Sequence, residues 1–391
     1  MKRTTGTALV FSVATLLLAG ACSSGSTAST PSETAGGDPS TAGPVSVDPA
    51  SLVPEHIVGK GPNGEEPASP DELTLTEDEA ARVRAGGFDV GVVMQTMDID
   101  WSTLQVQGIT ETLEKYGVKV AAVTDANFDV QQQIADIQNM IQIAPDGVIS
   151  IPVDDTATAE AYRSVSEAGI KLVFIHQAPK GLRYPGDYSS VISPDNQGNG
   201  EVAAEMLAAS VPQGGVVGIV DYGIDFFTTN QRTLRVQEWL ATNRPDIEVR
   251  KTDFIDPSKA GDTAGNFATA NPDLDGLFVI WDAPAMQTVS ALRAAGLDIP
   301  ITTIDLGNEV AIELAHGGLV KGLGAQRPYD QGVAEALAMM KSLIGDDTPP
   351  WVALPAFPVT QANVLTAYEE IFHTAAPKEL VDACADSGGC G

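Results

Sequence analysis

From Phe88 onward, short runs of apolar residues alternate with amphipathic stretches along the chain. The runs are long enough for strands and too short for most helices, and their continuous hydrophobicity is typical of strands covered on both faces. They lie at 90–93, 118–123, 147–151, 172–175 and, less strictly apolar, 188–193, and then at 216–220, 277–280 and 299–304. Between them apolar residues recur at helical spacing, as in Ile134, Ile137 and Ile141. This alternation predicts an α/β fold with doubly wound parallel sheets.

The series is interrupted at Pro-Asp-Asn-Gln-Gly (194–198), after which a long helical pattern begins. One series of strands and helices ends there and a second starts, so we expect two lobes, which a length of 391 residues accommodates. Two such sheets leave a cleft at the carboxyl ends of their strands. The first strand continues into Met-Gln-Thr-Met-Asp (94–98), which lacks the glycine fingerprint of a dinucleotide site, and no Gly-Lys-Ser/Thr phosphate loop occurs in the sequence.

The first 21 residues read as a secretory signal. Lys2 and Arg3 precede an apolar run at 8–18, which is too short for a membrane span. The sequence Leu-Ala-Gly-Ala-Cys (18–22) resembles a bacterial lipobox, which implies that Cys22 becomes a lipidated N-terminus; the alternative is an ordinary signal peptide cleaved nearby. Residues 23–55 are rich in Ser, Thr, Pro, Gly and Ala without periodicity and predict a disordered linker. Within 22–87, a capping box at Thr76 and Glu79 predicts a short helix that ends at two glycines.

Charge and cysteine content narrow the possibilities further. The formal charge of −30, from 52 acidic and 22 basic residues, repels phosphate backbones and excludes nucleic acid as an expected partner. Cys384 and Cys390 can close a small loop in an oxidising compartment, although a frayed tail without a role is the alternative. Two thiols do not complete a zinc site, so no metal is expected.

Several segments occur in an order and spacing that is similar to one family. In the first half they are Val92-Val93 with the polar loop that leads to Trp101, residues 131–134 together with 146–152, and Ser193-Pro-Asp-Asn196. In the second half they are residues 275–278 together with Trp281-Asp282, then Ile304-Asp305, and then Gly324-Ala-Gln326. Between about 88 and 375 the chain therefore resembles the type I periplasmic sugar-binding proteins, the ribose/galactose-binding group of receptors for ATP-driven (ABC) importers. Gene regulators of the same fold carry a basic helix-turn-helix in front, where this chain has a signal and a linker.

The resemblance implies a periplasmic binding protein type I fold with a three-strand hinge. Lobe 1 would comprise 88–194 and 327–353, lobe 2 would comprise 195–326 and 354–376, and 377–391 would form a C-terminal tail. The three crossings would lie near 193–196, 326–327 and 353–355. The expected protein is a monomeric, extracytoplasmic receptor that is tethered to the membrane by Cys22. It would need no cofactor, bind a small sugar or polyol, and deliver it to ABC permease subunits.

Candidate ligand contacts in the first lobe follow the first and fourth strands. Carboxylates and amides accept hydroxyl protons, and flat aromatic rings cover the C–H faces of a sugar. Asp98, Asp100 and Trp101 offer these groups, although Asp100 can instead cap the next helix and Trp101 can instead pack in the core. After the fourth strand, His176-Gln177 stand where the family's best-known sugar binders have Asp-Arg, and the histidine can alternatively be structural. An imidazole and an amide form mostly neutral hydrogen bonds, which suit an open-chain polyol or a modified sugar.

The resemblance places further contacts at the hinge and in the second lobe. The candidates are Asn196, Phe226, Phe227, Asn230, Arg232, Trp281, Asp282, Asp305 and Gln326, with Phe254 as a weaker one. Alternatively, one of the two consecutive phenylalanines packs in the core and Arg232 lies on the surface.

Three functions remain in view. The chain is expected to be an importer's receptor or a sensor subunit that presents bound ligand to a membrane kinase or chemoreceptor. A glycoside hydrolase using two cleft carboxylates is the enzymatic alternative. No specific acid/base pair and no Gly-x-Ser-x-Gly motif supports it, so we expect no enzyme.

Overall fold

A computed structural model describes residues 48–52 and 57–390. The predicted signal, Cys22 and most of the predicted linker therefore lie outside the described residues. Within the part that is described, no helix has both the length and the apolar character needed to cross a membrane.

The first lobe is built on a six-stranded sheet whose strand pairs are all parallel. In spatial order its strands are β11 (Trp351–Leu354), β5 (Ser190–Pro194), β4 (Lys171–Ile175), β3 (Gly147–Ser150), β1 (Asp89–Met94) and β2 (Lys119–Asp125). One face of the sheet packs against α2 (Asp100–Lys115) and α10 (Pro328–Leu343). The other face packs against α3 (Val130–Ile143) and α4 (Ala159–Glu167). Coverage on both faces explains why the central strands read as continuous apolar runs.

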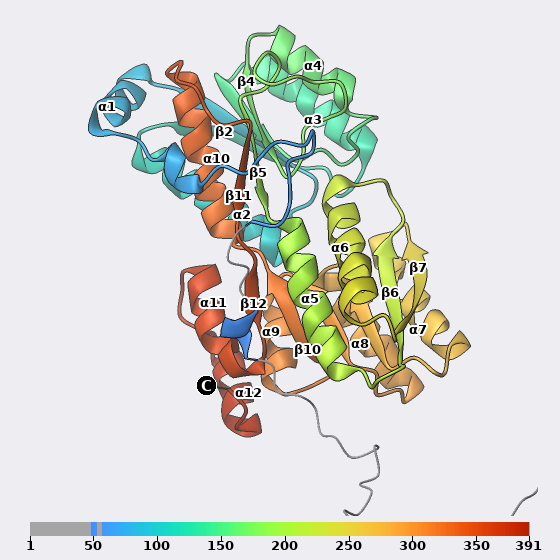
Figure 1. The fold of residues 1–391 in the computed structure, drawn as a ribbon. Helices are drawn as coiled ribbons and strands as arrows, with labels where there is room; N and C mark the ends of the chain where they lie inside the picture. Colours follow the sequence, from blue (N-terminus) through green and yellow to red (C-terminus); the bar gives the residue numbers. More distant parts are fainter. Residues whose placement is uncertain (1–47, 53–56, 391) are drawn as a thin grey trace, which may run out of the picture. The chain divides into compact units, whose positions relative to one another are not determined.

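The second lobe, in which Figure 1 labels β6, β7, β10 and β12, repeats this strand order. Its strands are β12 (Phe357–Val359), β10 (Val320–Ala325), β9 (Ile301–Ile304), β8 (Gly276–Val279), β6 (Val216–Tyr222) and β7 (Glu248–Phe254). Only β12 runs antiparallel to its neighbour among the described strands. The helices of this lobe are α5 (Asn196–Ser210), α6 (Phe227–Asn243), α7 (Ala260–Ala270), α8 (Asp282–Ala295), α9 (Asn308–Ala315) and α11 (Val364–Phe372). The predicted fold of two doubly wound parallel-sheet lobes is confirmed.

The chain passes between the two sheets three times. The passages lie between β5 and α5, between β10 and α10, and between β11 and β12. At the first passage the buried carboxylate of Asp195 accepts hydrogen bonds from three backbone amides, those of Val58, Gly59 and Gly198, at 2.6, 3.0 and 2.9 Å. A Cβ atom on Gly59 would lie 2.8 Å from Asp195 Oδ1, so a glycine is needed for this approach.

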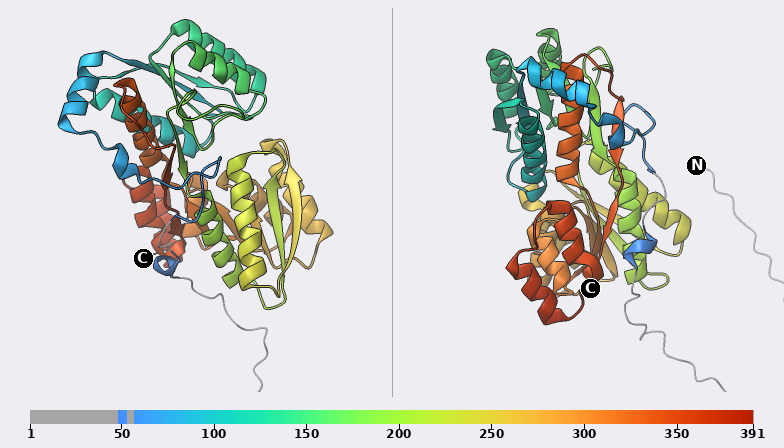
Figure 2. Two further views of the ribbon diagram at one scale, coloured as in Figure 1. Left: turned by 45° about the horizontal axis from the view of Figure 1, so that its top comes forward. Right: turned by 90° about the vertical axis from the view of Figure 1, so that its left-hand side faces the viewer.

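The segment 57–75, called here the N-terminal extension, is therefore tied to the hinge. It also reaches the first lobe, where Ala68 bridges Val352 of β11. The extension leads into α1 (Glu77–Gly86), whose predicted capping box is present at Thr76, and α1 packs beside α10 (Figure 2).

The C-terminal segment is helical. Residues 378–387 form α12 (Lys378–Ser387), which packs against α9 and α11 (Figure 2). This helix buries Leu380 and Ala383. Cys384 and Cys390 form a disulfide. A frayed tail, the alternative open from the sequence, does not describe this segment.

Candidate functional site

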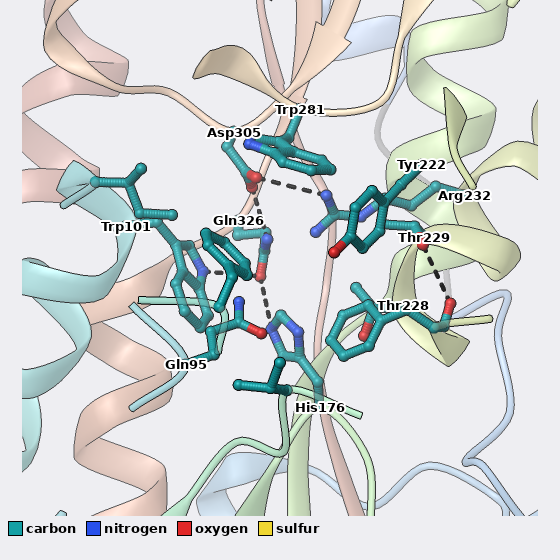
Figure 3. A pocket seen from close by; sticks show the side chains of 14 residues that line it. Gln95, Trp101, His176, Tyr222, Thr228, Thr229, Arg232, Trp281, Asp305 and Gln326 are labelled. Carbon is teal, nitrogen blue, oxygen red and sulfur yellow. Dashed lines mark hydrogen bonds and ion pairs between the residues drawn. The ribbon is translucent and has the colours of Figure 1, made fainter. Parts of the chain in front are cut away.

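A pocket lies between the two lobes, at the carboxyl ends of the strands of both sheets (Figure 3). The first lobe contributes Gln95, Ile99, Trp101, Phe128, Val153 and His176, the second contributes Tyr222, Phe226, Thr228, Thr229, Arg232, Trp281 and Asp305, and Gln326 stands at a crossing between them. We call this the inner pocket. Its only charged side chains among the described residues are Arg232 and Asp305.

Two inner-pocket residues occupy matching places in the two lobes. His176 directly follows β4, Asp305 directly follows β9, and these strands have the same position in their sheets. Both residues have left-handed backbone angles, with φ of 64° and 73°. Such a conformation is uncommon away from glycine and is often found at functional sites. Here it turns the chain sharply at the end of each strand.

Gln326 is the centre of a buried hydrogen-bond network. Its Oε1 accepts from Trp101 Nε1 at 3.1 Å, and its Nε2 donates to Asp305 Oδ1 at 2.6 Å. An indole N–H can only donate, so the orientation of the Gln326 amide is fixed by this partner. Gln331 supports the same oxygen from α10 at 3.2 Å. The network joins the first lobe through Trp101 to the second through Asp305.

His176 has a defined protonation state in this network. Burial, followed by the positive charge of Arg232, lowers the pKa of His176 to about 3, so the ring is neutral near pH 7. Its Nε2 lies 3.2 Å from Gln326 Oε1, an acceptor, so Nε2 carries the proton. Nδ1 is then an acceptor, and it is buried without a partner in the described part of the chain. His176 therefore offers one lone pair to a hydroxyl donor.

This protonation state has a consequence for acid stability. As the pH is lowered from 6.5 to 4.5, we expect the free energy of unfolding of the parent to fall by roughly 1 kcal/mol per pH unit relative to that of His176→Gln. An unfolded histidine binds a proton below about pH 6.5, whereas buried His176 does not until about pH 3. The stability from this group is thus complete above pH 6.5 and is lost as pH falls. Urea unfolding at several pH values measures both slopes.

The comparison with His176→Gln is needed because burial raises the pKa of Asp282 and Asp305, and raised carboxyl pKa values act on stability in the opposite direction. Asp282 and Asp305 are present in both proteins, and any strain that the substitution adds to the variant does not change with pH, so neither contributes to the difference between the two slopes. If the free energies of unfolding of the two proteins changed equally with pH, the pKa of His176 would be the same in the folded and unfolded protein.

Arg232 is fully enclosed, which corrects the alternative of a surface position. Its side chain is 3% exposed, and Nη1 lies 3.5 Å from Asp305 Oδ2. Nε donates to Asn196 Oδ1 at 3.1 Å, and Nη1 donates to the carbonyl of Ile280 at 3.3 Å. Asn196 thus holds the guanidinium from behind and does not itself line the inner pocket.

Aromatic rings form the walls of the inner pocket on both lobes. On the second lobe, the ring of Trp281 meets those of Tyr222 and Phe254 edge-on, with centroids 5.4 and 5.5 Å apart. Phe254 supports Trp281 and is not part of the lining. On the first lobe, the rings of Trp101 and His176 are 5.0 Å apart. Apolar faces from two sides with few polar groups are typical of small-molecule sites.

Residues 90–347 match the model of a family described as the periplasmic binding protein domain. The chain belongs to this family. Similar curated proteins include the ribose import binding protein of Bacillus subtilis, which is 24% identical over 241 residues, 62% of this chain and 77% of that protein. The xylitol-binding protein of Mycolicibacterium smegmatis is 27% identical over 257 residues, 63% of this chain and 70% of that protein.

Solved structures agree on the fold. A carbohydrate transporter solute binding protein from Agrobacterium radiobacter, in complex with D-arabinose, matches with a TM-score of 0.66 at 20% identity and covers 73% of this chain and 99% of that chain. The family consists of extracytoplasmic solute-binding proteins, so this chain is an extracytoplasmic solute-binding protein.

The inner pocket of this binding protein contains part of the candidate set. Trp101, His176, Phe226, Arg232, Trp281, Asp305 and Gln326 line it, whereas the other candidates do not. Asp98 is exposed. Gln177, Phe227 and Asn230 line a different pocket. The sequence analysis did not identify seven further lining residues: Gln95, Ile99, Phe128, Val153, Tyr222, Thr228 and Thr229. Several of them end or closely follow a strand, and this position in the sequence could have indicated them.

Two candidate carboxylates lie behind the inner pocket. Asp100 reaches from the first lobe to the N-terminus of α9, where it accepts from the backbone amide of Asn308 at 2.7 Å. It therefore caps a helix of the other lobe rather than its own. Asp282 lines a small neighbouring cavity with Asp305. A Cβ atom on Gly307 would lie 2.3 Å from Asp282 Oδ2 and 3.1 Å from Asp100 Oδ2, so the glycine allows both carboxylates to approach.

Proposed function

We propose that this binding protein takes a small neutral polyhydroxy ligand, a sugar or a polyol, into the inner pocket and delivers it to an ABC permease. The observation that carries the proposal is the combination of aromatic walls with one internally balanced ion pair. Because Asp305 neutralises Arg232, the pocket presents no excess charge to an ionic ligand. Aromatic faces suit the C–H surfaces of such a ligand.

Unused hydrogen-bonding groups support a hydroxyl-rich ligand. His176 Nδ1 and Thr228 Oγ1 are buried without a partner among the described residues. Leaving such atoms unpaired costs about 1–3 kcal/mol each, a cost that a bound hydroxyl would remove. The relatives named for ribose and xylitol and the neighbour with bound D-arabinose support the same ligand class. The neutral imidazole of His176 after β4 suits an open-chain polyol or a modified sugar as the unit in the inner pocket.

The ligand should leave the pocket chemically unchanged. Asp305 is the single carboxylate among the described residues of the inner-pocket lining, and it is paired with Arg232. Glycoside hydrolysis ordinarily uses two carboxyl groups on either side of the bond. The pocket does not offer that pair, which supports a receptor without enzymatic activity.

A thermal-shift screen tests the proposal. The panel contains D-ribose, D-xylose, D-galactose, xylitol and nucleosides, with L-amino acids as the control class. A ligand at 100 times its dissociation constant should add about 2.7 kcal/mol to the free energy of unfolding and raise the melting temperature. Mass spectrometry should recover the bound compound intact. Stabilisation by amino acids alone, or recovery of a converted product, would contradict the proposal.

We also propose that Cys22, which lies outside the described residues, carries a lipid that holds the receptor at the membrane. Cys22→Ala should move the protein from the membrane fraction to the soluble fraction, because several acyl chains hold firmly and their loss leaves no anchor. Ser23→Ala serves as the control and should stay in the membrane fraction. Fractionation with mass spectrometry of the N-terminal peptide measures both, and a parent N-terminus without lipid would rule the anchor out.

A further inference from the structure

A second pocket, called here the outer pocket, is formed by three separate parts of the chain. The N-terminal extension contributes Pro62 and Asn63, the first lobe contributes 177–181 with Asp155, and the second lobe contributes Asp225 and residues at the start of α6. It is thus a pocket between the lobes, as the inner pocket is.

The outer and inner pockets share two stretches of backbone. His176 lines the inner pocket and Gln177 the outer one, while Phe226 lines the inner pocket and Phe227 the outer one. Consecutive Cα atoms are 3.8 Å apart, so on each lobe the backbone that lines one pocket leads directly into the backbone that lines the other. The two pockets are thus neighbours on both lobes, which is the arrangement that a ligand of two linked units requires.

The outer pocket offers the same chemistry as the inner one. Gln177 is 1% exposed, and neither its Oε1 nor its Nε2 has a partner in the described part of the chain. Buried amides in native proteins are ordinarily paired, so this one is open to a partner from outside the chain, such as a ligand hydroxyl or a water. Phe227 is half-buried and gives an aromatic surface, and Asn230 adds an exposed amide.

The charged groups of the outer pocket are mutually paired. Lys180 Nζ lies 3.3 Å from Asp155 Oδ1 in the first lobe and 3.2 Å from Asp225 Oδ2 in the second. Asp225 also accepts from Asn230 Nδ2 at 2.8 Å. A phosphate or carboxylate would meet two aspartates here, whereas hydroxyl groups can bond to any of these side chains. The pocket therefore favours a neutral polyhydroxy unit.

One wall of the outer pocket lies outside the family domain. The match to the family begins at residue 90, whereas Pro62 and Asn63 belong to the N-terminal extension. The extension is held in place by Asp195 at the hinge and by Asn63, whose Nδ2 donates to Tyr188 Oη at 3.4 Å. The extension thus adds to the outer pocket a wall from outside the family domain.

We propose that the outer pocket is a second subsite, and that the preferred ligand is a disaccharide or glycoside whose first unit fills the inner pocket and whose second unit lies on Phe227 and bonds to Gln177. This inference rests on the proposed function, because it presumes a carbohydrate in the inner pocket.

Calorimetry on the full chain with matched one-ring and two-ring probes tests the subsite. The pairs are D-xylose with xylobiose, D-galactose with melibiose and with lactose, and D-glucose with maltose. In at least one pair the disaccharide should bind at least about tenfold more tightly than its monosaccharide. Phe227→Ala should remove that gain and leave the monosaccharide constant within about twofold, because Phe227 does not line the inner pocket. Leu234→Ala, an exposed apolar residue on the same helix, is the matched control and should change neither value.

Gln177→Leu gives an independent readout. It should also remove the disaccharide gain, and it should raise the melting temperature of the ligand-free protein, because an unpaired buried amide is replaced by an apolar side chain. Disaccharides that bind no more tightly than monosaccharides would overturn the subsite. It would also be overturned if Phe227→Ala and Gln177→Leu lowered the affinity for monosaccharides as much as that for disaccharides. If neither monosaccharides nor disaccharides bind, the proposed function fails and the subsite fails with it.

Discussion

Asp305→Asn should lower the affinity for the best ligand of the screen about ten- to a hundredfold and destabilise the protein by about 3–5 kcal/mol. Asp305 holds Gln326 with one oxygen and Arg232 with the other. The substitution keeps the shape and an amide contact but leaves the guanidinium buried without its carboxylate, which is costly because a buried charge depends on its partner. Calorimetry measures the affinity, and urea unfolding measures the stability.

Asparagine is the informative replacement at this position. Asp305 has φ of 73°, which Asn tolerates far better than Ala, so Asp305→Ala would add backbone strain to the loss of the charge. Asp298→Asn, an exposed aspartate of the same lobe, is the matched control and should stay within about 0.5 kcal/mol of the parent. If Asp305→Asn has the same free energy of unfolding and the same affinity as the control, the buried charge of Arg232 does not depend on Asp305.

Trp101→Ala should weaken binding by about thirty- to a thousandfold, which corresponds to about 2–4 kcal/mol for a large buried aromatic contact. The side chain is 6% exposed, and it forms the first-lobe wall and fixes Gln326 through its indole N–H. Trp101→Phe keeps a ring but loses that hydrogen bond, and its loss should be nearer fivefold. Calorimetry on both variants, with folding verified by circular dichroism, separates the ring from the hydrogen bond.

The control for Trp101 is Trp239→Ala. Trp239 packs partly buried in the core of the second lobe and does not line the inner pocket. Its removal should lower stability and leave the dissociation constant unchanged. Equal binding by Trp101→Ala and the parent would mean that the ligand does not contact the first-lobe wall.

The sequence determined the central strands because burial on both faces leaves a local signal. β1, β3, β4, β6 and β8 each contain or overlap a continuous apolar run, and the alternation with helical spacing predicts parallel sheets. β7 was not predicted, because it pairs only with β6 at a sheet edge and exposes Glu248 and Lys251. β12 has three residues and acquires its strand character from pairing with β10, which is remote in sequence.

For the site, the ends of the strands and the family resemblance together indicated positions that line the inner pocket. His176, Trp281, Asp305 and Gln326 follow strands closely, and the carboxyl ends of parallel strands meet at one edge of each sheet. That rule is local and topological, so it needs no coordinates.

Only the tertiary structure decided what each side chain does there. Phe226 and Phe227 are neighbours in sequence but face different pockets, because the start of α6 turns them apart. Asp100 caps a helix of the other lobe, and His176 gains its tautomer from Gln326, 150 residues away. These roles depend on groups that meet only when the lobes and the three crossings are assembled, and no pattern along the chain encodes that meeting.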